Sequence, residues 1–278
     1  MKVLAPIGDV QVVQWDVCSS TNALAADHLR QSANSSGAVI LAEEQTQGRG
    51  RMGRSWTTVR GEDLAMSLAM PVVTPQAAGR MSEDAAVVNM ALALDVLDAL
   101  KATLAAADID LPLRLKWPND IVVFAQGTHR KLGGMLIEPQ WAGPHLRGWV
   151  VGLGLNLHAR HMHRPHQGVS LWEATGQTTP LLPLARTIAQ RWLQQFATLG
   201  KAEPWPANDV LAAYHDALAF LHVPRTYERN GQAFAATLER VHRDGTADFV
   251  TPDGIRHRFN SSDIRGVLRD EDAGNQTG

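Results

Sequence analysis

The hydrophobic and polar positions divide the chain into a long first part of helices and strands and a short last part of strands. Three stretches of the first part have apolar residues every three or four positions, which predicts helices. These stretches run from a capping residue, Ser82, to about Ala106, from 184 to 199 and from 210 to 221. The first is apolar on most sides, so we expect it to be buried.

Alternation with a period of two and short apolar runs predict the strands. The predicted strands of the first part are 10–15, 39–41, 64–70, 113–116, 121–124, 131–138 and 149–157. Strand 64–70 alternates large with small residues, which indicates a half-buried strand. In strand 149–157 the residues Gly152, Gly154 and Asn156 share one face. We expect this bare face to be the floor of a pocket, with Asn156 at its rim.

From about Val223 the pattern changes to short strands joined by tight turns. The hairpin signals are Asn230-Gly231, Asp244-Gly245 and Asp253-Gly254. Such a run of hairpins predicts a small β-barrel. We therefore expect a large domain, 1–221, a small barrel, 222–268, and a flexible polar tail, 269–278.

The composition is that of a soluble globular protein, with 45% hydrophobic and 19% charged residues. The net charge of −2 argues against a surface that binds nucleic acid by counterion release, so we expect no DNA partner. Cys18 is the sole cysteine, which precludes an intramolecular disulfide and fits a reducing cytoplasm. The most apolar window, 87–100, contains Asp95 and Asp98. We therefore expect no signal peptide, no membrane partner and a cytoplasmic location.

Candidate chemistry concentrates in the loop from Gln45 to Trp56. Residues 48–54 contain three glycines and three arginines, and no acidic residue occurs between Gln45 and Arg60. The loop combines a free backbone with concentrated positive charge, which suits it to wrap around an anion.

Three other interpretations of this loop are possible. Gly48, Gly50 and Gly53 match the spacing of the dinucleotide fingerprint, which requires a helix to open within the glycines. Residues 55–61 have no helical apolar face, which argues against a dinucleotide site. A P-loop would need a Gly-Lys-Ser or Gly-Lys-Thr sequence that this stretch lacks. A solvated basic loop without a ligand is the remaining alternative.

Three further motifs accompany the loop. Ser20-Thr21-Asn22 is a run of helix-capping residues, Lys116-Trp117-Pro118-Asn119-Asp120 forms a turn between strands, and Lys131-Leu132-Gly133-Gly134 opens another strand. Capping and a hairpin turn alone would also explain the first two. Glycine within a strand often marks the close approach of a ligand or backbone.

Together with the Gly-Arg-Gly-Arg-x-Gly-Arg-x-Trp loop, these motifs resemble those of the biotin protein ligases. Members of that family adenylate biotin and transfer it to a lysine of a carboxyl carrier domain. The four motifs occur in the family's order between Ser20 and Glu138. The chain departs from the family pattern at Gln47 and Met52, neither of which replaces a residue with an expected role.

The resemblance implies an α+β fold, with a mixed β-sheet flanked by helices as in class II synthetases and a C-terminal SH3-like barrel. Residues 1–221 would bind biotin and ATP, and the partner would be a biotin carboxyl carrier protein. We expect the monofunctional type, without an N-terminal DNA-binding domain, because the active site already begins at Ser20. A monomer or weak homodimer is expected.

The resemblance also implies a set of binding residues. For biotin these are Ser20, Thr21, Asn22, Gln45, Gly48, Arg49, Arg51, Lys131 and Gly134. For the nucleotide they are Arg54, Trp56, Asn119, Asp120 and Asn156, with the Trp56 indole available to stack on adenine.

Adenylation must bring the carboxylate of biotin to the α-phosphate of ATP. At about 4 Å, two unit charges repel by roughly 1 kcal/mol in water and roughly 4 kcal/mol at an effective dielectric near 20. The site must therefore supply cations, and Lys131 and Arg51 suit that role. We expect Asp120 and Asn119 to hold the Mg²⁺ that accompanies ATP. Asp120 is also the candidate to deprotonate the acceptor lysine, which completes a catalytic set of Lys131, Arg51 and Asp120.

Competing interpretations fit the motifs less well. A lipoate ligase or octanoyltransferase resembles this fold, but that group lacks the doubled Gly-Arg loop and the Lys-Trp-Pro-Asn-Asp turn. A biotin-sensing DNA-binding repressor would need helices ahead of Ser20. An inactive binding module is disfavoured by the intact Lys131 and Arg51. In the histidine-rich segment 158–166 we expect a mobile loop near the adenine rather than a metal site, because the segment lacks regular structure.

Overall fold

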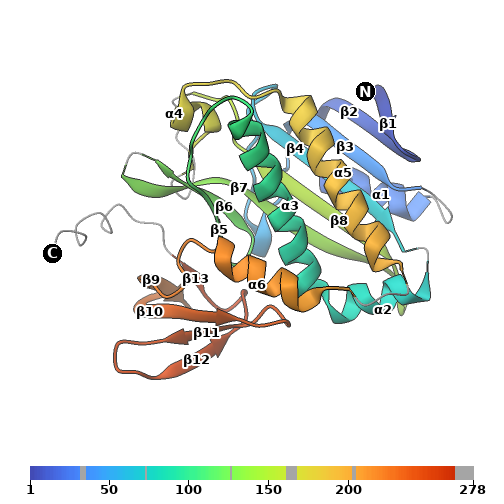
Figure 1. Ribbon diagram of the computed structural model, residues 1–278. Coiled ribbons are helices and arrows are strands. Elements are labelled where there is room, and N and C mark those ends of the chain that lie inside the picture. The colour runs from blue at the N-terminus through green and yellow to red at the C-terminus, as the bar shows by residue number, and fades with distance from the viewer. Residues whose placement is uncertain (32–35, 73, 126, 161–167, 202–204, 267–278) are drawn as a thin grey trace.

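An eight-stranded sheet forms the centre of the molecule (Figure 1). The computed structural model describes residues 1–31, 36–72, 74–125, 127–160, 168–201 and 205–266. The strands are β1 (Lys2–Ile7), β2 (Val10–Cys18), β3 (Ala38–Gln45), β4 (Leu64–Pro71), β5 (Leu113–Lys116), β6 (Asp120–Ala125), β7 (Thr128–Ala142) and β8 (His145–Leu155). Their spatial order is β1-β2-β3-β4-β8-β7-β6-β5. Because β2 and β3 are parallel and the other neighbours antiparallel, the sheet is mixed, as predicted.

Helices cover both faces of this sheet. They are α1 (Thr21–Gln31), α2 (Pro75–Glu83), α3 (Ala85–Ala105), α4 (Leu171–Thr175), α5 (Leu181–Leu199) and α6 (Ala207–Ala217). The long helices α3 and α5 pack together on one face, and α1 packs on the other (Figure 1). The expected burial of α3 is confirmed, since Val88, Leu92 and Leu100 are fully inaccessible. None of the helices in the described ranges is long and apolar enough to cross a membrane.

Strand β4 is buried on both faces, so the predicted half-buried strand was wrong. Leu68 contributes to the core under α3 and α5, while Ala69 packs against α1. The small residues that suggested an exposed face are small because α1 lies directly on them. Period two shows which residues share a face, but it does not show whether a helix covers that face.

Two helix boundaries also differ from the prediction. Ser82 lies in the last turn of α2, and α3 begins at Ala85 after the buried Asp84. Helix α6 ends at Ala217 because the next residues join strands: Leu218 forms a bridge with Leu115, and Leu221 with Leu238.

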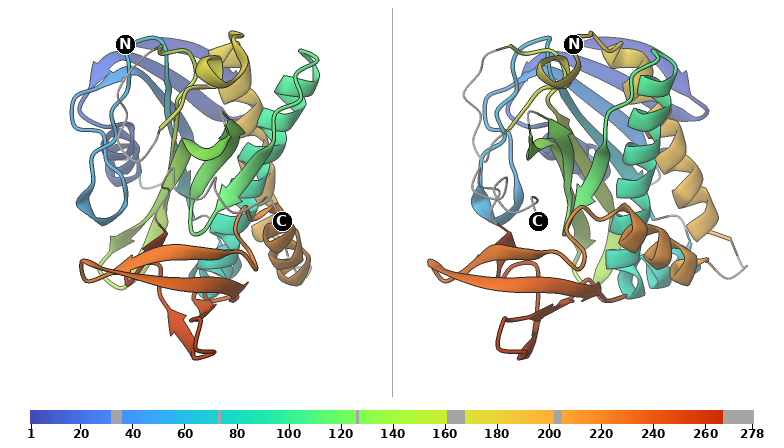
Figure 2. Two further views of the ribbon diagram at one scale, coloured as in Figure 1. Left: turned by 90° about the vertical axis from the view of Figure 1, so that its left-hand side faces the viewer. Right: turned by 60° about the vertical axis from the view of Figure 1, so that its left-hand side comes forward.

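The predicted hairpins form a second, five-stranded sheet, which we call the C-terminal barrel. Its strands are β9 (Pro224–Arg229), β10 (Gln232–Val241), β11 (Ala247–Val250), β12 (Arg256–Phe259) and β13 (Arg265–Gly266), in the order β12-β11-β10-β9-β13. Gly231, Gly245 and Gly254 occupy the turns with φ of +78° to +84°, a conformation that favours glycine. The barrel lies at one end of the large sheet, next to α6 (Figures 1 and 2). The predicted tail, 269–278, lies outside the described residues.

Candidate active site

A cavity of about 360 Å³ opens where the first turn of α1, the arginine-rich loop, the ends of β6, β7 and β8 and the barrel meet. Its lining includes these predicted site residues: Ser20, Thr21, Asn22, Gln45, Arg49, Arg51, Arg54, Trp56, Asn119, Asp120, Lys131, Gly134 and Asn156. Residues that lie far apart in the sequence are therefore brought together as predicted. Gly48, the other predicted residue, lies behind Trp56 at the base of the loop.

The floor of the cavity is the bare face of β8, which confirms that prediction. A Cβ atom on Gly152 would lie 2.1 Å from Asn22 Oδ1, and one on Gly154 would lie 2.2 Å from the Trp56 ring. On the neighbouring strand, a Cβ atom on Gly133 would lie 2.5 Å from the Gly154 carbonyl oxygen. These strands need glycine because side chains and backbone approach them closely.

One end of the cavity is a buried network of neutral polar groups. Thr21 donates from both its backbone N and its Oγ1 to Gln45 Oε1, over 2.8 and 3.1 Å. Ser67 Oγ lies 2.8 Å from Thr21 Oγ1 and 2.6 Å from Asn22 Oδ1. Ser20, Thr21 and Asn22 are at most 5% exposed, so this end is rigid and holds several hydrogen-bonding groups in fixed directions.

Glu138 connects this end to the loop. Its Oε2 accepts from Asn22 Nδ2 over 2.6 Å and from Arg49 Nη2 over 3.1 Å. The Arg49 side chain is half exposed, and exposed ion pairs contribute little to stability. Glu138 is the last residue of the strand predicted at 131–138, and no role was expected for it.

The loop itself is closed at its base by backbone hydrogen bonds. Trp56 N donates to Gly48 O over 2.8 Å, and Gly50 N donates to Arg54 O over 2.7 Å. A Cβ atom on Gly48 would lie 2.3 Å from the Trp56 carbonyl oxygen, which explains the glycine there. The loop contains a single turn of 3₁₀-helix, Arg51–Gly53, in place of the long helix of a dinucleotide site.

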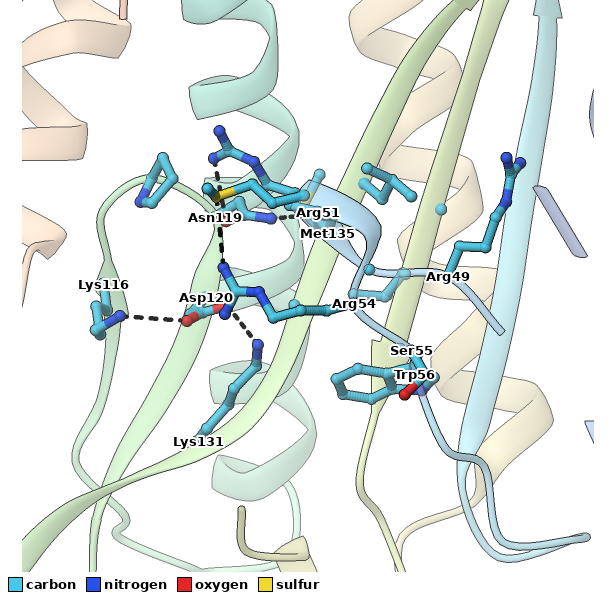
Figure 3. Close-up of a pocket in the computed structure, with 18 of the residues that line it drawn as sticks. Arg49, Arg51, Arg54, Ser55, Trp56, Lys116, Asn119, Asp120, Lys131 and Met135 are labelled. Atoms are coloured by element: carbon cyan, nitrogen blue, oxygen red, sulfur yellow. Dashed lines mark hydrogen bonds and ion pairs between the residues drawn. The ribbon is translucent and has the colours of Figure 1, made fainter. Parts of the chain in front are cut away.

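At the opposite end lies a cluster of charges (Figure 3). Asp120 Oδ1 lies 2.6 Å from Lys131 Nζ, and Asp120 Oδ2 lies 3.4 Å from Lys116 Nζ. Burial favours a raised pKa for Asp120, but the Lys131 and Lys116 ammonium groups outweigh it and lower the pKa to about 2. Burial lowers the pKa of Lys116, opposed by Asp120 and reinforced by Lys131. Gly134 leaves room for the cluster, since a Cβ atom there would lie 3.1 Å from Asp120 Oδ1.

This geometry bears on the two roles expected of Asp120. A carboxylate with a pKa of about 2 is a weak base, which weighs against proton abstraction from a lysine whose usual pKa is about 10.4. Both Asp120 oxygens face ammonium groups, and Asn119 Oδ1 accepts from Arg51 Nη1 over 3.4 Å. The described residues hold no group of three or more His, Cys, Asp or Glu that could bind a metal. The Mg²⁺ expected at Asp120 and Asn119, directly or through water, stays a prediction, because a site completed by phosphate oxygens and water needs only one or two ligands from the protein.

Comparison with known proteins identifies the family. Residues 15–156 match the model of the biotin/lipoate A/B protein ligase family. The chain belongs to this family. It is 36% identical over 149 residues to a biotin-acetyl-CoA-carboxylase ligase of Mycobacterium tuberculosis. The matched residues cover 52% of this chain and 49% of that protein. It is 30% identical over 171 residues to the bifunctional ligase/repressor BirA of Bacillus subtilis, and these residues cover 60% of this chain and 47% of BirA. The chain thus spans about half the length of the curated relatives it matches.

The fold extends beyond the matched region. A biotin protein ligase from Aquifex aeolicus, in complex with biotin and ATP, has a TM-score of 0.69 to this chain at 20% identity. The match covers 93% of this chain and 99% of that one. It confirms the predicted α+β class, a mixed sheet flanked by helices with a C-terminal sheet consistent with a small SH3-like domain.

Lys116 and the barrel's part of the site were also not predicted. Lys116 opens the Lys-Trp-Pro-Asn-Asp motif but was expected to have no role, although its charge between the apolar Leu115 and Trp117 was a signal that it faces a polar site. The barrel supplies Ser261, Ile264, Arg265 and Gly266 to the lining, and nothing in its hairpin pattern indicated this. Of the histidine-rich segment 158–166, residues 161–166 lie outside the described residues, so the expected mobile loop near the adenine stays a prediction.

Proposed function

We propose that the protein is a biotin protein ligase. It adenylates biotin with ATP, releases pyrophosphate, and transfers biotin from biotinyl-5'-AMP to a lysine of a biotin carboxyl carrier protein. The division into a biotin- and ATP-binding domain, 1–221, and a barrel, 222–268, is part of this proposal, as is a monomeric or weakly dimeric state.

The observation that carries the proposal is the polarity of the cavity. Its two ends differ: Thr21, Asn22 and Gln45 surround a neutral polar end, whereas Lys116 and Lys131 mark a cationic end. A ureido ring needs neutral donors and acceptors, and a carboxylate next to a phosphate needs cations. The distribution suits a ligand with a ureido head and a carboxylate tail. The apolar dithiolane ring of lipoate offers no hydrogen-bonding group to the polar side chains at the first end.

The residues would divide the work between the two anions. Lys131 extends from the rigid strand β7 and would neutralise charge where the carboxylate meets the α-phosphate. The loop arginines would close over the acid and its adenylate, and Arg54, Trp56 and Asn156 would contact the nucleotide. Magnesium enters this proposal as the counter-ion of ATP, and no step is assigned to it.

The transfer step requires the neutral amine of the carrier lysine. Asp120 is better suited to attract the incoming ammonium than to remove its proton, because its pKa is held at about 2. Loss of the proton would then occur to solvent or to another group before attack on the mixed anhydride.

The test is to supply purified protein with labelled ATP and with biotin, lipoate or octanoate in turn. Biotin should drive pyrophosphate release and the other two acids should not. Equal release with lipoate or octanoate would favour the alternative of a lipoate ligase of the same family. Release with none of the acids would overturn both ligases and favour an octanoyltransferase, which transfers an already activated acyl group without ATP.

A further inference from the structure

Arg51 connects the arginine-rich loop to the C-terminal barrel. Its Nη2 donates a hydrogen bond to Ser261 Oγ, and its Nη1 donates to Asn119 Oδ1 over 3.4 Å. Arg51 and Ser261 are 210 positions apart in the sequence, so their contact exists only when the barrel is docked.

The turn that presents Ser261 is held by hydrogen bonds of its own, which do not involve the loop. Asn260 N donates to Asp263 Oδ2 over 3.1 Å, and Asp263 N donates to Asn260 O over 3.0 Å. The neighbouring Ile264 is 4% exposed and anchors the turn in the barrel core. Ser261 is therefore a preorganised acceptor, and little freedom is lost when Arg51 binds to it.

Further contacts join the barrel to the large domain. Asp84, at the start of α3, accepts from Arg243 Nε and Nη2 over 2.6 and 3.0 Å, a bidentate pair. The Trp117 ring, next to Asn119, packs edge-on against Phe249 with 5.7 Å between centroids. Ser261 thus has a fixed position relative to the cavity, while the loop has three glycines and must lose entropy to close.

We propose that Ser261 is a positioning residue through which the C-terminal barrel holds Arg51, and with it the arginine-rich loop, over the cavity. Another contact of the loop with the large domain, Arg49 to Glu138, is half exposed on the Arg49 side and is expected to contribute little to holding the loop. This positioning of the loop by Ser261 does not depend on the proposed function. The consequence that Ser261 helps to retain the acyl-adenylate rests on the proposed function.

The experiment is limited trypsin digestion of the full chain without ligands. Cleavage after Arg49, Arg51 and Arg54 reports how often the loop opens. Ser261→Ala removes the acceptor, and Ser261→Thr keeps it. Ser262→Ala is the matched control, because Ser262 is exposed and its Oγ contacts Asp263 in the same turn.

Ser261→Ala should be cut about tenfold faster than wild type, as expected for loss of a hydrogen bond to a charged group. Ser261→Thr and Ser262→Ala should stay within about twofold. In an Arg51→Gln background, Ser261→Ala should add nothing to cleavage after Arg49 and Arg54. Wild-type rates for Ser261→Ala, or equal acceleration by Ser262→Ala, would overturn the proposal.

The functional consequence is measured separately. With biotin and ATP, Ser261→Ala should attach more biotin to bystander serum albumin than Ser262→Ala does. If the wild type forms no adenylate, the proposed function fails while the digestion result stands. If digestion shows an open loop but albumin labelling is unchanged, the Ser261 contact does not serve to retain the adenylate.

Discussion

Asp120→Asn should destabilise the protein and leave two buried ammonium groups without a counter-ion. The side chains of Lys116, Asp120 and Lys131 are only 12 to 17% exposed, so solvent cannot replace the carboxylate. The pKa of Asp120 falls from 3.8 to about 2 in the folded state. A shift of this size corresponds to about 2 to 3 kcal/mol of folding free energy. Removing one partner from a buried ion pair typically costs about 3 to 5 kcal/mol, so we expect a loss of about 3 kcal/mol.

The pH dependence has a definite sign. Because the folded pKa is depressed, the stabilisation is complete above the unfolded value of 3.8 and is lost as the pH falls through about 2. Urea unfolding at pH 7 should show the loss in Asp120→Asn but not in Asp9→Asn, since Asp9 is exposed between β1 and β2. Inorganic pyrophosphate should raise the melting temperature of Asp120→Asn more than that of wild type, because an anion can replace the missing carboxylate. The reasoning is refuted if both substitutions lower the unfolding free energy equally.

Three further predictions concern Lys131, Arg51 and Asp95. Lys131→Ala should slow adenylation about a hundredfold, measured by pyrophosphate release, because it removes charge stabilisation of the transition state; an unchanged rate would contradict this. Arg51→Gly should still consume ATP but release adenylate that biotinylates serum albumin, and albumin labelling at the wild-type level would exclude a retaining role for the loop. In α3, burial raises the pKa of Asp95 to about 6, opposed by Gln195 and Arg191. Ionisation of Asp95 therefore costs folding free energy, and this cost grows as the pH rises from 3.8 to about 6 and is constant above that. Asp95→Asn should stabilise the protein by about 3 kcal/mol at pH 7.5 and about half that at pH 5. An identical gain at both pH values, measured by urea unfolding, would count against this.

The parts of the fold that depend on residues close together in the sequence, such as hairpin turns, could be predicted. Hairpin turns such as Asn230-Gly231 require a backbone conformation that few residues adopt, so they identified the barrel strands. The burial of β4 could not be predicted, because it depends on α1 covering a face that the strand pattern shows only as small residues. The start of α3 was missed for a similar reason. Asp84 precedes that helix, and its partner Arg243 comes from the barrel.

The candidate site was predictable to the extent that its chemistry is local in sequence. Trp56 and the loop arginines share one motif, and the alternation in β8 indicated the bare floor. Glu138 and Ser261 were not predictable, because an isolated acid or serine carries no signal of its own. Their importance comes from the atoms they meet, Asn22 and Arg49 in one case and Arg51 in the other.

The charges at the cationic end of the cavity explain why Asp120 lies in a site that is proposed to bind anions. Without a ligand, Lys116 and Lys131 would repel each other at low exposure, and Asp120 neutralises part of that charge. The carboxylate thereby stabilises the folded protein and keeps both ammonium groups oriented toward the cavity. An incoming phosphate would compete with Asp120 for the same lysines, so stability without a ligand and affinity for one are opposed. This conflict is why Asp120→Asn should lose stability yet respond more strongly to pyrophosphate than wild type does.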